Sequence, residues 1–402
     1  MKTAPVVADI LLPQGFAFSS TTAGIKVSGS PDFALVEAFQ GAAAAAMFTT
    51  NRVMAAPLIV DRDHLKRSRG RMRALVVNSG NANCATGKHG IDGCQAVCRA
   101  VADELVCDPE EVFPSSTGVI GVPFPAEKLI NAVPTLVSAR RAEPDAARHF
   151  ARAIMTTDTR MKIAASRFKR GKSEVTLFGV CKGAGMIHPR LATMLVYLFS
   201  DVEATPAELQ PMLAEAVRVS FNRVNIDGDT STNDTVLLLA SGESGVKLSA
   251  VAAQFASALT GVCQALAKQI VSDGEGVRHV VNLHIEGARD DAEASQVAKA
   301  ISNSALVKTA WAGSDPNWGR ILAAVGYSGA AVDPSKVDIF FGRHQVCGKG
   351  MAAPFNEAEV HTYLSQPVFD VRVRLGRGKV SGTFWTCDLT AEYVRINADY
   401  RT

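Results

Sequence analysis

The sequence predicts a mixed α/β protein, either α+β or a layered α/β arrangement, rather than a doubly wound parallel sheet. Three observations support this prediction. Apolar, β-rich runs alternate with helical patterns along the whole chain, and some consecutive strands are separated only by short glycine-containing segments, which favours antiparallel pairs. The chain has 402 residues, too many for one compact core, so we expect two domains or one large unit with an additional lobe.

In the first half of the chain, Ala74–Val77 predicts a buried strand, and Gln95–Leu105 follows it with the apolar spacing of a helix. Further on, Val175–Val180 and Met194–Phe199 each have the apolar character of a strand. A segment that contains glycine and proline separates these two runs. We therefore expect a turn between them.

The second half begins with a helix signal. Thr205 and Glu208 have the spacing of a capping box, with a proline at the first helical position. The helix that follows has one apolar face, made of Leu209, Met212, Leu213, Ala216 and Val217. A strand at Thr235–Ala240 then leads into a long helix over residues 249–273, which Gly274 ends.

Two more strands are predicted near the C-terminus. Residues 369–375 alternate between apolar and charged side chains, which is typical of a half-buried strand. Gly376 and Gly378 then predict a turn into a second strand around Val380–Trp385.

Composition and charge argue against several classes of protein. Hydrophobic residues make up 47% and charged residues 20%, an ordinary balance for a soluble protein. The net charge is +3 and the 42 basic residues are scattered, so nothing predicts a nucleic-acid surface. The apolar stretch from Val6 to Leu12 is short and interrupted by Asp9, unlike a signal peptide, and we expect no later run to approach a membrane span. We expect a cytoplasmic protein with reduced cysteines.

Familiar cofactor and metal motifs are not found. Gly378-Lys379-Val380 lacks the residues of a phosphate loop, and no GxSxG elbow occurs. His279 and His284 are five apart in a predicted strand, so they face opposite sides and cannot share a metal. Cys94 and Cys98 are four apart in a predicted helix, where two buried thiols are the simpler interpretation and a metal pair the alternative. We expect no metal and no prosthetic group.

The most informative segment runs from Lys182 to Leu195. Two glycines and a proline bound a short loop, which leads to Ala192-Thr193 at the start of an apolar strand. Composition alone predicts a turn between two strands, with Thr193 as an ordinary β-branched strand residue.

The whole segment closely resembles the autoprocessing site of the ornithine acetyltransferase family, the glutamate N-acetyltransferases of arginine biosynthesis. Other segments resemble the family in the same order along the chain, from about residue 13 to the C-terminus. They are Asn78–Asn83, Ser116–Gly121, Met155–Thr159, Asn225–Asp234, Asp273–Gly276, Asp315–Arg320 and Arg395–Asn397. So many linked motifs are not expected by chance.

The resemblance implies that the chain cuts itself between Ala192 and Thr193 and then uses Thr193 as a nucleophile. Cleavage would activate the site, because it turns the Thr193 amide into a free amine, a base that titrates at roughly 7.7–8.0. The family fold implies a layered α/β sandwich with mixed and antiparallel sheets, convergent in mechanism with N-terminal-nucleophile enzymes. We expect an alpha chain of 1–192 and a beta chain of 193–402, with a C-terminal subdomain from about 279 to 402. Two alpha and two beta chains would form a heterotetramer.

The resemblance also assigns roles to individual residues. Thr117 and Gly118, expected in a loop, would stabilise the oxyanion. Lys182, expected on the loop beside the nucleophile, and Glu275, just past the 249–273 helix, would bind the charged ends of an amino acid, although composition alone suggests solvated surface charges. The remaining positions that hold substrate in the family match Thr156, Thr193, Asn397 and Thr402. His188 receives no role.

The implied reaction transfers an acetyl group from N²-acetyl-L-ornithine to L-glutamate by a ping-pong mechanism through acetyl-Thr193. Some members also accept acetyl-CoA as a substrate, and no motif decides this point. One alternative is a self-processing amidase or aminopeptidase of similar architecture, in which water resolves the acyl-enzyme. A second alternative is an uncleaved binding protein that keeps the fold.

Overall fold

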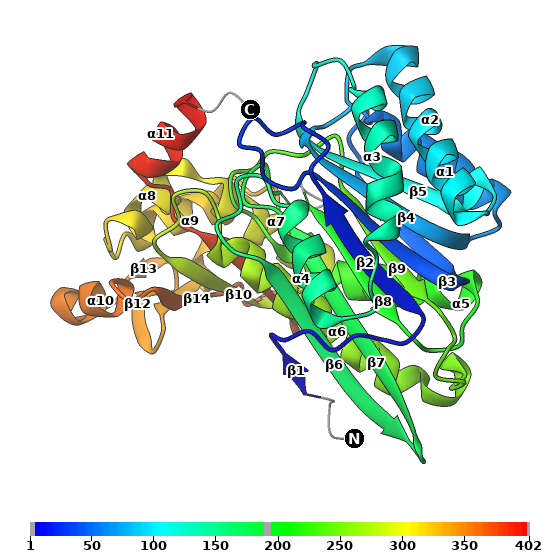
Figure 1. The fold of residues 1–402 in the computed structure, drawn as a ribbon. Helices are drawn as coiled ribbons and strands as arrows, with labels where there is room; N and C mark the ends of the chain where they lie inside the picture. Colours follow the sequence, from blue (N-terminus) through cyan, green and yellow to red (C-terminus); the bar gives the residue numbers. More distant parts are fainter. Residues whose placement is uncertain (1–4, 189–193, 400–402) are drawn as a thin grey trace.

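A large nine-stranded sheet forms the centre of the molecule in the computed structural model, which describes residues 5–188 and 194–399 (Figure 1). Its strand order is β1-β6-β7-β8-β9-β3-β4-β5, with β2 paired to β3. The sheet is mixed, because β8–β9 and β4–β5 are parallel whereas the other pairs are antiparallel. The strands are β1 Val6–Val7, β2 Phe16–Thr21, β3 Phe33–Phe48, β4 Arg71–Asn81, β5 Val112–Val119, β6 Lys162–Arg170, β7 Ser173–Lys182, β8 Leu195–Ser200 and β9 Thr235–Ala240.

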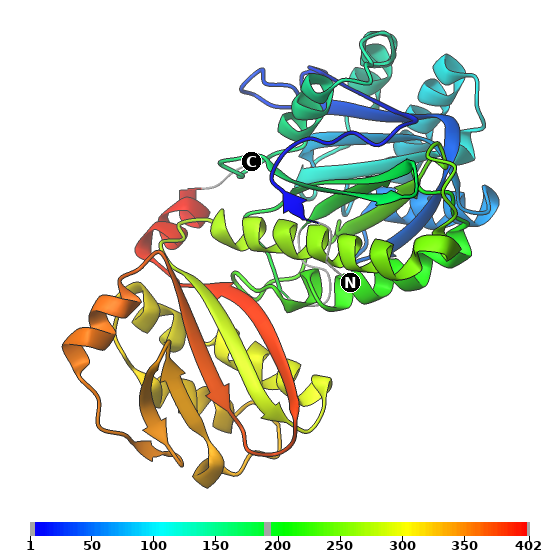
Figure 2. The same ribbon diagram turned by 90° about the horizontal axis from the view of Figure 1, so that it is seen from below.

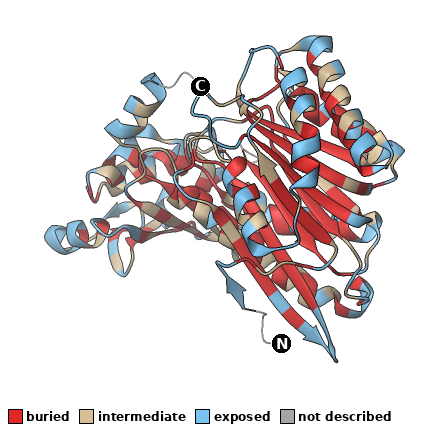
Figure 3. Cartoon of the chain, in the orientation of Figure 1, coloured by how far each residue is buried: buried red, intermediate tan, exposed pale blue. Residues whose placement is uncertain are grey.

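Strand β8 shows why the apolar runs predicted from sequence become central strands. All six of its residues are buried, and alternate side chains point to opposite faces of a strand. Val196 and Leu198 enter one hydrophobic core, whereas Tyr197 and Phe199 enter a second core on the other face. Figure 3 shows the central strands mostly in the colour of buried residues, because a hydrophobic core lies against each face of the sheet. The predicted strands at Ala74–Val77, Val175–Val180, Met194–Phe199 and Thr235–Ala240 correspond to β4, β7, β8 and β9.

Helices cover both faces of the large sheet. α5 and α6 pack on the face that contains Val196, and α4 packs on the opposite face. A further group, α1 to α3, shares a separate hydrophobic core with side chains of β3, β4 and β5. The predicted capping box of α5 is confirmed, since Thr205 and Glu208 bond reciprocally. The bounds are α1 Ala56–Arg67, α2 Gly87–Leu105, α3 Ala126–Ser138, α4 Pro144–Ala153, α5 Pro206–Arg218 and α6 Leu248–Ser272, with 3-10 turns at Pro109–Glu111 and Phe221–Arg223.

A second sheet of six strands, in the order β13-β12-β11-β14-β10-β15, belongs to the C-terminal part of the chain. Its own hydrophobic core includes residues of α7, α8, α9 and α10, and α11 is the last helix described. The strands are β10 Val280–Ala288, β11 Asp338–Phe341, β12 His344–Gly348, β13 Met351–Ala352, β14 Val368–Arg374 and β15 Val380–Cys387. The helices are α7 Asp291–Asn303, α8 Ala305–Ala312, α9 Trp318–Gly326, α10 Glu357–Leu364 and α11 Ala391–Asp399, with a 3-10 turn at Pro334–Lys336.

The two strands predicted on either side of Gly376 and Gly378 exist as β14 and β15, but they are not neighbours. β10 lies between them, parallel to β14 and antiparallel to β15. The connecting turn passes over the end of β10, where the backbone N–H groups of Arg377 and Gly378 both donate to the Gly287 carbonyl at 2.8 Å. The turn therefore caps a third strand instead of closing a hairpin.

Helix α6 corrects one expectation from the sequence. By length and composition it could cross a membrane, the one such helix in the described part of the chain, whereas no run was expected to approach this limit. It packs against β6, β7 and α5 and also contacts β15 of the second sheet. In Figure 2 it runs along the large sheet, with the second sheet forming a lobe beyond it. Its apolar side chains belong to the core that it shares with β7 and β8.

Candidate active site

A cavity of about 190 Å³ gathers the predicted site residues that the structure describes. They come from β5, the loop after α4, the end of β7, the loop after α6, and α11. The predicted residues on its wall are Thr117, Gly118, Thr156, Lys182, Glu275 and Asn397. Ala192, Thr193 and Thr402 lie outside the described residues. Residues more than 200 positions apart in sequence, such as Thr156 and Asn397, thus share one cavity.

Thr117 and Gly118 lie inside β5, so the prediction that they occupy a loop is wrong. β5 runs parallel to β4, and Gly118 is paired with Gly80. A Cβ on Gly118 would lie 2.2 Å from the Gly80 carbonyl carbon, and the Gly118 φ of +135° is one that few other residues adopt. The close backbone approach expected from this glycine is therefore to the neighbouring strand.

Lys182 is the last residue of β7, not part of the loop, and its residue exposure is only 3%. The interpretation of Lys182 as a solvated surface charge is therefore wrong. Its Nζ donates to Thr117 Oγ1 at 3.1 Å, which joins the predicted carboxylate-binding lysine to the predicted oxyanion residue. Burial lowers the pKa of Lys182, and the nearby Asp158 carboxylate only partly offsets this effect.

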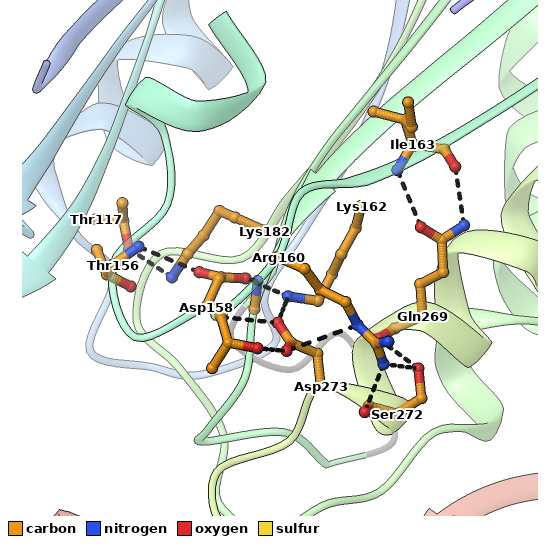
Figure 4. Close-up of polar contacts among 12 residues, drawn as sticks. Thr117, Thr156, Asp158, Arg160, Lys162, Ile163, Lys182, Gln269, Ser272 and Asp273 are labelled. Atoms are coloured by element: carbon orange, nitrogen blue, oxygen red, sulfur yellow. Dashed lines mark hydrogen bonds and ion pairs between the residues drawn. The ribbon is translucent and has the colours of Figure 1, made fainter. Parts of the chain in front are cut away.

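Behind Lys182 lies a buried ionic cluster that sequence reasoning missed (Figure 4). Lys162 Nζ contacts Asp158 Oδ1 and Asp273 Oδ2, each at 2.5 Å. Burial alone would raise the pKa of Asp158, but Lys182 and Lys162 outweigh burial and hold that pKa at about 2. Burial likewise disfavours the Lys162 ammonium, and the two carboxylates overcome it, so the pKa of Lys162 is raised. Asp158 and Lys162 are therefore both charged at neutral pH.

Glu275 follows α6, as predicted, and it lines the cavity. Asn397 Nδ2 on α11 donates to Glu275 Oε2 at 2.9 Å. The Glu275 backbone N–H donates to the Ala184 carbonyl at 2.9 Å, which joins this loop to the segment after β7. A Cβ on Gly185 would lie 2.6 Å from Glu275 Oε2, so only glycine leaves room for the carboxylate as it is placed.

The cavity also contains acidic and aromatic residues that received no role from the sequence, among them Asp227, Asp229 and Tyr393. Asp227 accepts hydrogen bonds from the backbone N–H groups of Met186 at 2.5 Å and Ile187 at 2.8 Å. Tyr393 Oη donates to Asp227 at 3.3 Å. Burial raises the pKa of Asp227. The segment Asn225–Asp234 carried a signal, because it matched the family, but its individual side chains had no predicted partners.

Asp234 connects the start of β8 to the same region. It is fully buried, and its Oδ1 accepts from the Met194 backbone N–H at 3.0 Å. Burial raises the pKa of Asp234 well above its ordinary value. The neighbouring Asn233 donates through Nδ2 to the carbonyls of Ala82 at 2.7 Å and Ser116 at 2.8 Å. These bonds hold the chain that follows residue 193 close to β5.

Among the described residues, no group of three or more His, Cys, Asp or Glu side chains could hold a metal ion. His279 contacts the Gln366 carbonyl at 2.8 Å, and His284 contacts Thr383 and Asp370. Cys94 and Cys98 are both free and buried, as the simpler interpretation expected.

Comparison with known proteins assigns the family. The model of the ArgJ family matches residues 17–402. "Arginine biosynthesis bifunctional protein ArgJ" of Syntrophotalea carbinolica is 45% identical over 393 residues, covering 96% of this chain and 99% of that protein. The chain belongs to the ArgJ family. The ArgJ protein of Geobacter sulfurreducens is 44% identical, covering 97% of this chain and 99% of that protein.

Solved structures of ArgJ proteins are also similar. The crystal structure of the bifunctional ArgJ protein from Bacillus halodurans is 41% identical, with a TM-score of 0.49, and covers 51% of this chain and 98% of that chain. Ornithine acetyltransferase from Mycobacterium tuberculosis, complexed with ornithine, is 34% identical, with a TM-score of 0.43, and covers 48% of this chain and 100% of that chain. The family resemblance inferred from the sequence motifs is confirmed by the ArgJ family match and the curated ArgJ relatives.

Proposed function

We propose that this ArgJ family member transfers an acetyl group from N²-acetyl-L-ornithine to L-glutamate in arginine biosynthesis. The observation that carries the proposal is the cavity itself. It brings a buried hydroxyl, a buried ammonium and a carboxylate together, at Thr117, Lys182 and Glu275. The relatives are named for arginine biosynthesis, and one solved relative is an ornithine acetyltransferase complexed with ornithine.

In this proposal Thr193 is the nucleophile, released by cleavage after Ala192. The Thr193 hydroxyl attacks the Ala192 carbonyl and forms an ester, which water hydrolyses to free the Thr193 α-amine. That amine has a pKa of roughly 7.7–8.0 in model compounds, so it can remove the hydroxyl proton near neutral pH. Attack on the acetyl carbonyl of acetyl-ornithine then releases ornithine, and the α-amine of glutamate takes the acetyl group from Thr193.

The oxyanion formed in each step would be stabilised by Thr117 and Gly118. Because Lys182 donates to Thr117 Oγ1 at 3.1 Å, one lone pair of this oxygen is engaged and the hydroxyl hydrogen is left to donate. The buried ammonium also polarises the hydroxyl, which makes it a stronger donor to a developing negative charge.

Substrate recognition would use the two charged side chains of the cavity that the family pattern assigns to substrate. Lys182 would bind the α-carboxylate that both substrates share. Glu275, oriented by Asn397, would bind an ammonium group. Thr156 and Thr402 would add further polar contacts, as in the family pattern.

Several further features belong to the same proposal. The chains 1–192 and 193–402 would remain together, with a C-terminal subdomain from about 279 to 402, and assemble as a heterotetramer of two alpha and two beta chains. Acetyl-CoA would be a second acetyl donor, in keeping with the word bifunctional in the names of the relatives. The reaction needs no prosthetic group, and we place the enzyme in the cytoplasm.

Two measurements test the proposal together. Purified protein should run as two chains, the second beginning with Thr193-Met194-Leu195, and Thr193→Ala should remain a single chain without transfer activity. In assays without acetyl-CoA, the native protein should turn over, producing ornithine and N-acetylglutamate, only when acetyl-ornithine and glutamate are both present. Release of free acetate without glutamate would instead indicate an amidase, and an intact chain without turnover would indicate a binding protein.

A further inference from the structure

Lys162 is a fully buried lysine beside the cavity that does not line it. Its residue exposure is 0%, and its ammonium lies between the carboxylates of Asp158 and Asp273. It comes from β6, which contributes no residue to the cavity wall. A buried charge of this kind is costly unless it has partners, so its position calls for a physical explanation.

The two carboxylates that hold Lys162 are also attached to the cavity wall. Asp158 Oδ2 accepts from the Thr156 N–H at 3.1 Å, and Asp158 Oδ1 accepts from the Gly183 N–H at 2.7 Å, next to Lys182. Asp273 accepts from the Thr159 N–H at 3.1 Å and lies two residues before Glu275. Figure 4 shows Lys182 and Lys162 on either side of Asp158.

Lys162 is the buried cation that joins the two carboxylates of this cluster, whereas Arg160, with its side chain 55% exposed, reaches only Asp273, at 3.7 Å. Two buried carboxylates, Asp158 and Asp273, face two buried ammonium groups, Lys162 and Lys182. Lys162 contacts both carboxylates directly, whereas the hydrogen bond of Lys182 goes to the neutral Thr117 hydroxyl. Among the residues that the structure describes, Lys182 makes no direct contact with a carboxylate, and its ammonium is favoured only by the nearby charge of Asp158 and more distant carboxylates.

We propose that Lys162 is a positioning residue that neutralises Asp158 and Asp273, and thereby leaves the Lys182 ammonium available to a substrate carboxylate. This inference rests on the proposed function of the cavity. Without Lys162, Asp158 would be left with Lys182 as its nearest strong counter-ion, and a buried ion pair would form between them. A substrate carboxylate would then have to compete with Asp158 for the same ammonium, which weakens binding without altering the Thr193 chemistry.

The test compares Lys162→Met with native protein in the processed enzyme. Lys162→Met should raise KM for both acetyl-ornithine and glutamate by roughly 10- to 100-fold, the range expected when one hydrogen bond to a charged group is lost. The turnover number and self-cleavage should change little. Lys169→Met is the matched control, because Lys169 lies on the same strand with its side chain 75% exposed, and it should leave both constants unchanged.

A double variant separates the electrostatic role from a merely structural one. Lys162→Met/Asp158→Asn removes the carboxylate that would compete for Lys182, so its KM values should return to within about threefold of native protein, a residual loss under 1 kcal/mol. If Lys162 only stabilises the loops around the cavity, the double variant should bind both substrates as weakly as the single variant, or more weakly. The reason is that Asn replaces a carboxylate that accepts hydrogen bonds from two N–H groups.

The outcomes are distinguishable. Native protein that fails to transfer acetyl groups overturns the proposed function. Native transfer together with an unchanged KM in Lys162→Met, or with an unrestored KM in the double variant, overturns this inference alone. Should Lys162→Met not fold, the double variant carries the test by itself, and weakened binding by that variant refutes the role of Lys162.

Discussion

Gly185→Ala places a methyl group directly against the carboxylate of Glu275. The added Cβ would lie 2.6 Å from Glu275 Oε2 and 2.7 Å from Cδ, whereas ordinary contacts begin near 3.4 Å. The carboxylate oxygen must therefore move away by about 0.8 Å, the difference between 3.4 Å and 2.6 Å. Gly185 is not among the glycines with positive φ, so alanine imposes no left-handed strain on the backbone. The perturbation should stay confined to one flexible side chain.

The displacement has a calculable consequence for recognition. Oε2 accepts the 2.9 Å bond from Asn397 that orients Glu275, and a retreat of this size takes the pair out of good hydrogen-bonding range. Losing a hydrogen bond to a charged group costs about 1.5–3 kcal/mol, which corresponds to roughly 10- to 100-fold in kcat/KM. Acetyl-ornithine carries a side-chain ammonium and its α-nitrogen is already acylated. We therefore expect the larger loss in formation of the acetyl-enzyme from acetyl-ornithine.

Single-turnover measurements can follow the two half-reactions separately. Acetyl-Thr193 is detected by intact mass after mixing with acetyl-ornithine, and its discharge is followed after addition of glutamate. Glu275→Gln should reproduce the asymmetry, and Gly326→Ala, where the new Cβ meets no atom within 4 Å, should behave as native protein. Equal losses in both half-reactions, or native rates in Gly185→Ala with an unchanged melting temperature, would refute the assignment of Glu275 to an ammonium group.

Three further predictions concern Thr117, Lys182 and the pH dependence of the reaction. Thr117→Ala should lower the turnover number by roughly 10²-fold with a smaller change in KM, the order seen when one oxyanion donor is lost; a variant with normal turnover and only weaker binding would exclude this role. Lys182→Ala should weaken both half-reactions by similar factors in the single-turnover assay, and a defect limited to the glutamate step would mean that Lys182 binds the side-chain carboxylate instead. In pH profiles from about 6 to 10, the turnover number should rise as the Thr193 α-amine loses its proton near its ordinary range. KM should rise at alkaline pH, because burial lowers the pKa of Lys182 and its binding-competent ammonium is lost at a lower pH than in free lysine; a KM that stays flat across this range would contradict the role of its charge.

Local signals explain which elements could be predicted. The capping box of α5 depends on residues three apart, and the alternation in β14 depends on residues two apart, so both could be recognised from short segments. The pairing of β14 and β15 with β10 could not be recognised in this way, because periodicity indicates which face of a strand is buried but not which strand lies beside it.

For the candidate site, the sequence likewise identified residues but not their surroundings. Family motifs located Thr117, Lys182 and Glu275 in the sequence, and all three line one cavity. They did not reveal that Lys182 is buried, that Thr117 lies within a strand, or that Asp227 and Tyr393 share the cavity wall. A lone lysine in a sequence resembles a surface charge, because the energy that keeps it buried comes from partners elsewhere in the chain.

The sequence by itself determined the α/β class, the main apolar strands, the family and the identity of the residues proposed to react. The tertiary structure alone decided the electrostatic environment of those residues. Lys162 and Asp273 are 111 positions apart, and they meet only because β6 and the end of α6 pack together. Coulomb interactions depend on distance in space and on exclusion of water, and neither quantity is encoded in a short stretch of sequence.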